Sequence, residues 1–174
     1  MTNQYFDATV PVFIKSLTAL KGVLSKGKAF ADEKKVSEDV LLRSRLAVDM
    51  FDLTRQVQIA CDNAKGSSAR LAGVPLPSFE DNEKTFAELD ARIDKTLAFL
   101  ATFTPEQFAD TANRKVMLPY FKDKHFIGSE FTYQYALPNF FFHMTVAYAI
   151  LRHLGVPIGK ADFSGGLPLK DGPA

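Results

Sequence analysis

The sequence predicts an all-α protein, built as a single bundle of four helices. Four long segments carry apolar residues at alternating spacings of three and four, the pattern of a helix with one buried face. The connections between them are short or moderate, so neighbouring helices can pack side by side. With 174 residues, of which 47% are apolar, the chain is long enough to bury one compact core.

The first helix is expected at about residues 6–26. Its apolar stripe consists of Phe6, Val10, Phe13, Leu17, Leu20 and Leu24. Pro11 has no amide hydrogen, so it either lies in the first turn or kinks the helix. Residues 27–35 are expected to form a connecting loop.

The second helix is expected to begin after Ser37, which is a good N-cap and is followed by two acidic residues. Its seam, at heptad spacing, is Leu42, Leu46, Asp49, Leu53, Gln56 and Ala60. The helix runs to about residue 64, or to about residue 71 if it continues past Gly66. The segment 73–77, Gly-Val-Pro-Leu-Pro, ends it.

Ser78 is expected to cap the next helical region, which is the third helix. Its stripe is Phe86, Leu89, Ile93, Leu97 and Leu100. Thr104-Pro-Glu-Gln then predicts a short turn of helix, because the threonine caps it and the proline suits its first position. Residues 110–130 are mixed, with short extended pieces expected around Val116 and at residues 125–127.

The fourth helix is expected at about residues 129–154, with a kink or a restart at Pro138. Gly155 ends it as a C-terminal glycine. Residues 1–158 therefore form one bundle domain. The segment 159–174 is rich in glycine and proline and is expected to be an irregular tail.

Composition excludes several classes of partner. The chain has 21 Lys and Arg against 20 Asp and Glu, so there is no global basic field to attract nucleic acid or an anionic membrane. A single cysteine, Cys61, rules out an intramolecular disulfide and fits a reducing compartment. The first residues lack the basic and apolar regions of a signal peptide, and no apolar run approaches a membrane span. The expected location is the cytoplasm.

The candidate site consists of Asp49, Asn139 and His143. Asn139 and His143 stand four residues apart, so they share one face of the fourth helix. Asp49 is expected in the middle of the second helix's seam. If the two seams face each other, a carboxylate, an amide and an imidazole meet inside the bundle, where such folds hold metal sites.

Three interpretations of this trio remain open. In the first, His143 donates a hydrogen bond to Asp49, and the network is completed by Asn139 and Gln56. The site is then purely structural. In the second, the trio binds a divalent metal, for which Asp and His suit zinc, nickel or iron. In the third, it is a metal-free site for a small molecule or for proton transfer. An unpaired buried charge is costly, so Asp49 must be paired, metal-bound or protonated.

Other reactive residues favour ordinary roles. His125 falls in an expected loop, and His153 falls in the last turn of its helix, where an imidazolium meets the helix dipole favourably. Cys61 is expected to be a small buried residue rather than a nucleophile. Arg43, Arg45 and Arg55 are expected to be solvated. Aromatic residues concentrate between Tyr120 and Phe142, which indicates core packing, a pocket wall or a dimer interface.

Three segments resemble a known family. They are Met50-Phe-Asp-Leu-Thr-Arg-Gln-Val-Gln-Ile-Ala-Cys-Asp-Asn-Ala-Lys-Gly66, Ala136-Leu-Pro-Asn-Phe-Phe-Phe-His143 and Leu151-Arg-His-Leu-Gly-Val-Pro-Ile-Gly-Lys-Ala-Asp-Phe163. They are similar to a bacterial family catalogued as a domain of unknown function, within the DinB/YfiT-like superfamily of proposed metalloenzymes. The resemblance covers nearly the whole chain. It implies a four-helix bundle in up-down-down-up order, often dimeric.

The resemblance also implies where a metal would lie. Metal-binding members typically use one histidine from the second helix and two, four residues apart, from the last long helix. His143 matches the second of that later pair, Asn139 matches the first, and Asp49 is the counterpart of the helix-two histidine. Two hypotheses follow: a ligand-binding or enzyme-like bundle, of transferase or hydrolase type by resemblance, and a non-catalytic module that acts as a homodimer.

Overall fold

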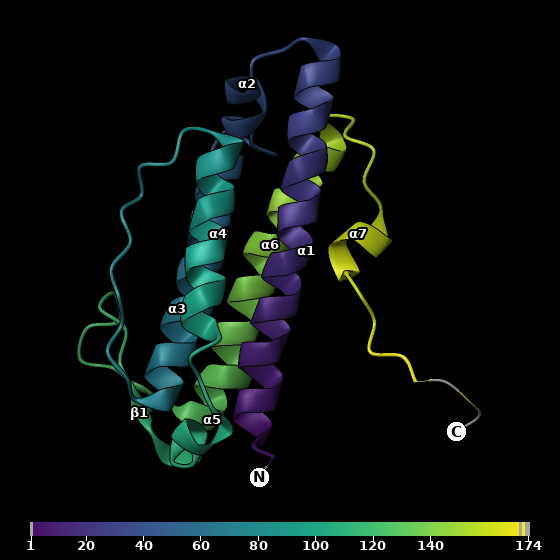
Figure 1. The fold of residues 1–174 in the computed structure, drawn as a ribbon. Helices are drawn as coiled ribbons and strands as arrows, with labels where there is room; N and C mark the ends of the chain where they lie inside the picture. Colours follow the sequence, from purple (N-terminus) through teal and green to yellow (C-terminus); the bar gives the residue numbers. More distant parts are fainter. Residues whose placement is uncertain (1, 171, 173–174) are drawn as a thin grey trace.

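The protein is a four-helix bundle in up-down-down-up order, as Figure 1 shows. The fold is that of a computed structural model, which describes residues 2–170 and 172. The four long helices are α1 (Gln4–Lys34), α3 (Leu53–Ala72), α4 (Phe86–Leu100) and α6 (Leu137–His153). Helix α3 packs against the other three, and most extensively against α6. The expected fold class is therefore confirmed.

The first helix is longer than predicted. Residues 27–34, expected as a loop, continue α1 for two more turns before Lys35 ends it in the left-handed conformation, with φ of 56°. Within this extension Gly27 lies against the bundle, where a Cβ would come within 3.1 Å of Leu151. Ala31 is likewise buried one turn later. These small residues let α1 pack closely against the bundle there.

Helix α1 is long and apolar enough to cross a membrane by length and composition. Its apolar stripe is instead buried in the core, since Phe13, Leu17 and Leu20 are at most 1% exposed. Pro11 does not end the helix, which runs through it. The length of α1 reflects its position along the whole height of the bundle (Figure 1).

The predicted second helix is in fact two helices. Short α2 (Glu38–Leu42) is followed by an irregular loop, residues 43–52, and then by α3. Asp52 starts the new helix, because its side chain accepts a hydrogen bond of 2.9 Å from the amide of Arg55. Of the two ends left open by the sequence, the structure has the later one: α3 continues past Gly66 to Ala72 and is capped by Gly73, which has a φ of 71°.

A long crossover, residues 73–85, connects the lower end of α3 to the upper end of α4 (Figure 1). The expectation that Ser78 caps the third helix is wrong. The cap is Thr85, whose hydroxyl accepts from the amide of Glu88 while the Glu88 carboxylate accepts from the Thr85 amide. This reciprocal pair satisfies two free amides at once, which fixes the start of α4 at Phe86.

Short elements close the lower end of the bundle. They are η1 (Pro105–Phe108), η2 (Thr111–Asn113), the strands β1 (Lys115–Val116) and β2 (Phe126–Ile127), α5 (Gly128–Glu130) and the π-helical η3 (Phe131–Ala136). The strands are antiparallel, with Lys115 opposite Ile127. The predicted helical turn and extended pieces are therefore present.

The last long helix is interrupted, as predicted, near Pro138. Proline cannot donate to the carbonyl four residues earlier, and the preceding turn, η3, widens into π geometry before α6 begins. The segment expected as an irregular tail contains one further helix, α7 (Lys160–Ser164). It packs on α1 through an ion pair of 2.6 Å between Asp162 and Lys26.

Candidate functional site

The structure brings two of the three predicted site residues to the seam between α3 and α6. His143 is buried, and Asn139, one turn earlier on α6, is partly exposed. Asp49 is exposed and lies in the loop 43–52. The prediction that Asp49 faces His143 from the middle of a helix is therefore wrong, because the helix that would carry it begins only at Leu53.

His143 pairs with Gln56 of α3. The distance between His143 Nδ1 and Gln56 Oε1 is 2.7 Å. Gln56 Nε2 in turn donates to the carbonyl of Phe51 at 3.2 Å, which leaves Oε1 facing the imidazole as an acceptor. His143 therefore donates from Nδ1 and carries its lone pair on Nε2. Gln56 was a polar member of the predicted seam, and the structure shows that it is the one beside His143.

The imidazole of His143 is neutral near pH 7. Burial, and to a lesser extent the positive charge of nearby Arg55, together lower its pKa from 6.5 to about 4. Protonation at Nε2 would create an imidazolium that is poorly hydrated and is repelled by the positive charge of Arg55. His143 is thus a fixed hydrogen-bonding group at physiological pH rather than a charged one.

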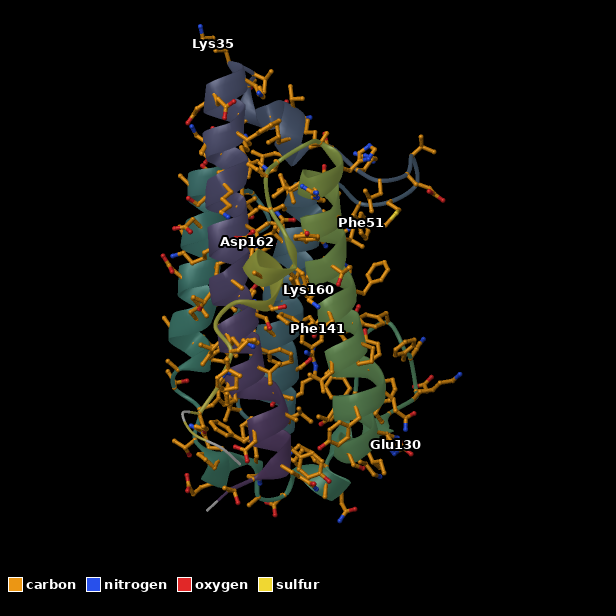
Figure 2. All side chains as sticks on the ribbon, turned by 90° about the vertical axis from the view of Figure 1, so that its right-hand side faces the viewer. Lys35, Phe51, Glu130, Phe141, Lys160 and Asp162 are labelled. Carbon is orange, nitrogen blue, oxygen red and sulfur yellow. The ribbon has the colours of Figure 1, made fainter. Side chains whose placement is uncertain are left out.

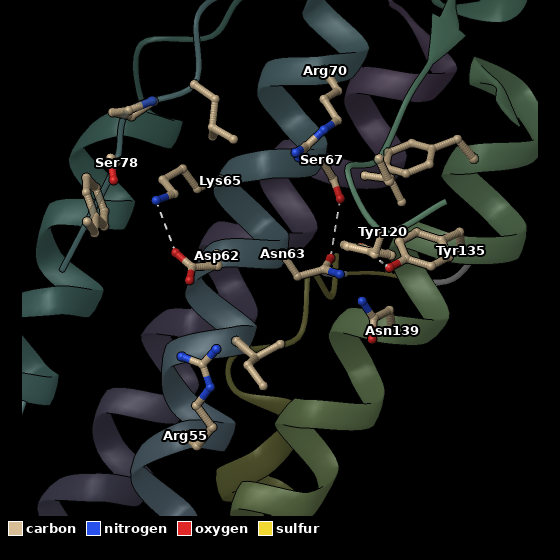
Figure 3. Close-up of a pocket in the computed structure, with 16 residues that line it drawn as sticks. Arg55, Asp62, Asn63, Lys65, Ser67, Arg70, Ser78, Tyr120, Tyr135 and Asn139 are labelled. Carbon is tan, nitrogen blue, oxygen red and sulfur yellow. Dashed lines mark hydrogen bonds and ion pairs between the residues drawn. The ribbon is translucent and has the colours of Figure 1, made fainter. Parts of the chain in front are cut away.

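A cleft of about 420 Å³ opens next to this pair, between α3, the crossover and the segment that leads into α6 (Figure 3). Its polar wall includes Arg55, Asn63, Ser67 and Arg70 of α3 and Asn139 of α6. Its apolar wall includes Leu76, Leu118, Phe131 and Tyr135. A volume of this size suits a small molecule, and the mixture of apolar walls with a few convergent polar groups is typical of ligand pockets.

Two amide side chains face each other across the cleft. Figure 3 shows the amide groups of Asn63, from α3, and Asn139, from α6, pointing toward one another. The hydroxyl of Ser67 donates to Asn63 Oδ1 at 3.4 Å, which leaves the Asn63 NH₂ group toward the open space. No hydrogen bond among the described residues joins the two amides, so both retain donors for a third group.

The two arginines of the cleft differ in their partners. Arg55 donates to Gln58 Oε1 at 3.1 Å and forms an ion pair with Asp81 of the crossover. Arg55 is solvated, as expected, since 39% of its side chain is exposed, and it is paired as well. Arg70 forms no ion pair or side-chain hydrogen bond within residues 2–170 and 172. Its guanidinium lies along its own helix, where a Cβ on Gly66 would come within 2.6 Å of it.

A buried ionic network holds the crossover wall in place. Arg92 of α4 is 3% exposed, and its Nη1 lies 2.9 Å from Glu83 Oε1. Its Nη2 lies 2.9 Å from Asp62 Oδ1, which also lies 3.1 Å from the Nζ of buried Lys65. The same Nζ stacks 3.8 Å from the ring centre of Phe79. Lys65 and Asp62 therefore neutralise each other and fix the crossover, although both line the cleft.

Tyrosine hydroxyls form the other end of the cleft. Tyr120 and Tyr135 are hydrogen-bonded through their hydroxyl groups. Burial and this bond raise the pKa of Tyr135, while the charge of Arg70 acts in the opposite direction. The hydroxyl of Tyr135 is thus protonated at neutral pH, and Arg70 is close enough to act on it. The aromatic concentration predicted as core, pocket wall or interface includes a pocket wall here.

The metal implied by the resemblance does not fit these residues. A structural or catalytic zinc site needs three or four nitrogen, sulfur or carboxylate donors around one point. Here one imidazole is present, with its lone pair on Nε2 because Nδ1 donates to Gln56, and the amide of Asn139 is a weak ligand. Asp49 lies outside the site. Among the described residues, no three His, Cys, Asp or Glu side chains are grouped to hold a metal ion.

The remaining reactive residues lie where the sequence predicted. His125 is exposed in the loop before β2, and His153 is exposed in the last turn of α6. Cys61 is fully buried, and burial raises the pKa of its thiol to about 12, which removes the thiolate needed of a nucleophile. The residues that sequence reasoning missed are Asn63 and Arg70. Each is an ordinary polar residue on a helix, and its partners across the cleft come from distant segments.

Comparisons with known proteins agree with this fold. The family described as a domain of unknown function, DUF1993, matches residues 5–164. The chain belongs to this DinB-like family. A crystal structure of a DinB family member protein from Shewanella denitrificans is 47% identical, with a TM-score of 0.92 over 96% of this chain and 95% of that chain. No curated protein matches the chain. The predicted family is therefore confirmed, at the level of a DinB-like helical bundle.

Proposed function

We propose that this DUF1993 protein binds a small molecule in the cleft between α3, the crossover and α6. One observation carries the proposal: polar groups from separate elements converge on a cleft of about 420 Å³ without satisfying one another. The amides of Asn63 and Asn139 come from two helices, and Arg70 adds a guanidinium without a carboxylate partner in the described part of the chain.

A purely structural polar core would have a different arrangement. Buried polar groups in stable cores are paired, because each unmet donor costs about 1–3 kcal/mol. The pair of His143 and Gln56 meets that rule, since each has its partner. The donors of Asn63, Arg70 and Asn139 are instead partly exposed, so water or a ligand can reach them. Their convergence on one cleft supports binding of a ligand that replaces this water.

The chemistry of His143 favours binding over proton transfer. An efficient general base has a pKa near the working pH, whereas burial lowers the pKa of His143 to about 4. Its Nδ1 bond to Gln56 fixes the register of α6 against α3 and so holds Asn139, one turn away, at the cleft. His143 is thus a positioning residue for the cleft wall.

A ligand screen monitored by NMR tests this proposal. Mixtures of small metabolites are expected to shift the side-chain amide signals of Asn63 and Asn139. The variant Asn63→Trp fills the cleft and is expected to abolish the shift of the Asn139 signal, which this variant still has. Asn113→Trp, at an exposed position outside the cleft, is the matched control and keeps both shifts. Ligands that bind the Asn63→Trp variant as well as the wild type would place the site elsewhere.

A second candidate function is self-association through the loop 43–52. Three of its apolar side chains are exposed: Leu46 by 42%, Val48 by 94% and Phe51 by 56%. Figure 2 shows Phe51 next to α6, and Phe142 of that helix is 54% exposed. Exposed apolar side chains that gather on one loop are typical of protein interfaces. The occupant that we propose is a second copy of the chain.

Sedimentation equilibrium tests this second candidate. Val48→Asp is expected to convert a dimer into a monomer, because a charge would be buried at the contact. Met117→Asp, at another exposed apolar position, is the control and should leave the dimer intact. A wild-type protein that is monomeric at about 100 µM would contradict the candidate, because a specific interface holds at that concentration.

We also propose a location in the bacterial cytoplasm. The one cysteine of the chain, Cys61, is buried and has no partner within the chain with which to form a disulfide. The family resemblance is to bacterial proteins. Fractionation of cells that express the protein, followed by immunoblotting, is expected to recover it with a cytoplasmic marker. Recovery with the envelope fraction would contradict this location.

A further inference from the structure

The charges that line the cleft leave one cation free. Arg55, Lys65 and Arg70 line it against a single carboxylate, Asp62. Lys65 and Asp62 lie 3.1 Å apart, and Arg55 is paired with Asp81 of the crossover. Arg70 has no carboxylate partner in the part of the chain that the structure describes. The positive charge available to a ligand is therefore concentrated at one guanidinium.

Neutral donors surround the same space. Asn63, one turn before Ser67 on α3, presents its NH₂ group because its Oδ1 accepts from Ser67. Asn139 faces it from α6 (Figure 3). Tyr135 lies close enough to Arg70 for the guanidinium charge to act on its hydroxyl. The guanidinium and the two amide NH₂ groups that line this cleft are donors that a carboxylate can accept from.

Apolar side chains continue from this polar end. Leu118, Phe131 and Tyr135 line the cleft, and the rings of Phe131 and Tyr135 are stacked with centroids 5.5 Å apart. A fully inorganic anion would leave this wall in contact with water. A ligand that places an apolar or aromatic group there gains burial free energy of about 25 cal/mol per Å² of apolar surface.

We infer that the cleft binds a small monocarboxylic acid with an apolar or aromatic body. Its carboxylate lies between Arg70 and the amides of Asn63 and Asn139, and its body lies against Phe131 and Tyr135. The inference rests on the proposed function and adds the chemical class of the ligand.

A single negative charge fits better than a phosphate. Arg70 is the one guanidinium of the cleft that no carboxylate of residues 2–170 and 172 neutralises, while Arg55 and Lys65 are engaged in the ion pairs that hold the crossover. A phosphate dianion would require a second free cation to offset its charge on leaving water. A carboxylate needs one guanidinium, which can bind it in bidentate fashion.

Titrations followed by NMR test the ligand class with defined probes. Phenylacetate and 3-phenylpropanoate are compared with phenylacetamide, a neutral molecule of the same shape, and with phenyl phosphate. The acids are expected to shift the amide signals of Asn63 and Asn139 and to bind at least about tenfold more tightly than the amide. Arg70→Gln is expected to remove that preference by weakening only the acids. Arg152→Gln, an exposed position outside the cleft with the same change in net charge, is expected to bind as the wild type does.

A second variant covers the case in which Arg70→Gln does not fold. Asn139→Asp places a carboxylate beside the ligand's own, so it is expected to weaken the acids at least about tenfold and to leave phenylacetamide nearly unaffected. Equal binding of acid and amide at the cleft would overturn the carboxylate and leave the proposed function standing. The carboxylate inference would also be overturned if phenyl phosphate bound most tightly, if Arg70→Gln bound the acids as the wild type does, or if the acids shifted no signal from the cleft.

Discussion

Replacing His143 with glutamine is expected to make the stability of the protein less dependent on pH between 6.5 and 4. In the unfolded chain this histidine takes up a proton near pH 6.5, whereas burial and the charge of Arg55 lower its pKa in the folded protein to about 4. Above pH 6.5 both states are neutral and the group contributes nothing. Below it, the unfolded state binds more protons, so the free energy of unfolding falls as the pH falls.

The size of the effect follows from the two pKa values. One pKa unit corresponds to about 1.4 kcal/mol, so the loss reaches about 2 kcal/mol at about pH 5 and about 3 kcal/mol at about pH 4. Glutamine cannot titrate, yet its NH₂ group can still donate to Gln56. We expect His143→Gln to cost about 1–2 kcal/mol at neutral pH through poorer packing. At about pH 5 it should be as stable as the wild type.

Urea unfolding, followed by circular dichroism at about pH 7.5 and about pH 5, measures this difference. Carboxylates whose pKa is lowered in the folded state, such as Asp81 and Glu88, also contribute less stability at the lower pH. This loss is the same in both proteins, so it cancels when their free energies of unfolding are compared. Thr145→Ala, exposed on the same helix and without a titrating group, is the control and should follow the wild-type curve. If the free energy of unfolding falls by the same amount in His143→Gln and in the wild type between the two pH values, the conclusion that His143 is buried as a neutral imidazole is refuted.

Two further predictions concern packing and metals. Gly128→Ala is expected to lower the free energy of unfolding by about 3 kcal/mol, because its Cβ would come within 1.9 Å of the Thr111 carbonyl. Gly22 lies in α1 with open space around it, so Gly22→Ala is expected to raise the free energy of unfolding by about 0.5–1 kcal/mol. A thermal shift assay measures Tm for both variants. A change of Tm in the same direction for Gly128→Ala and Gly22→Ala would contradict this prediction. Addition of zinc or nickel, or treatment with EDTA, is expected to leave Tm unchanged, because the described residues group no further His, Cys, Asp or Glu side chains with the one imidazole to complete a metal site. A rise in Tm with metal that disappears in His143→Ala would show that the donor set is sufficient after all.

The sequence identified the helices better than their ends. The stripe of α1 was visible from Phe6 to Leu24, but the helix continues through Gly27, where the glycine allows close contact with Leu151. A pattern of local spacings cannot show that contact, since its partner lies more than a hundred residues away. The same limit explains α2 and α3, where the heptad spacing of apolar residues continues across a loop that Asp52 ends by capping a new helix.

The candidate site shows the limit more sharply. His143 and Asn139 could be paired from sequence, because residues four apart on a helix share a face. The third residue could not be chosen, since Asp49 and Gln56 both occupied the expected seam. A break of ten residues, 43–52, moves Asp49 to the surface and leaves Gln56 opposite the imidazole.

The sequence by itself determined the fold class, the DinB-like family and the inward position of His143. These follow from helical periodicity and from motifs, which are properties of neighbouring residues along the chain. Only the tertiary structure decided which groups lie together. Gln56 is bonded to His143, Asn63 and Asn139 face each other across the cleft, and Arg70 has no carboxylate partner within the described residues. Such pairings depend on where helices end and how they pack, and those are set by contacts between residues that are distant in sequence.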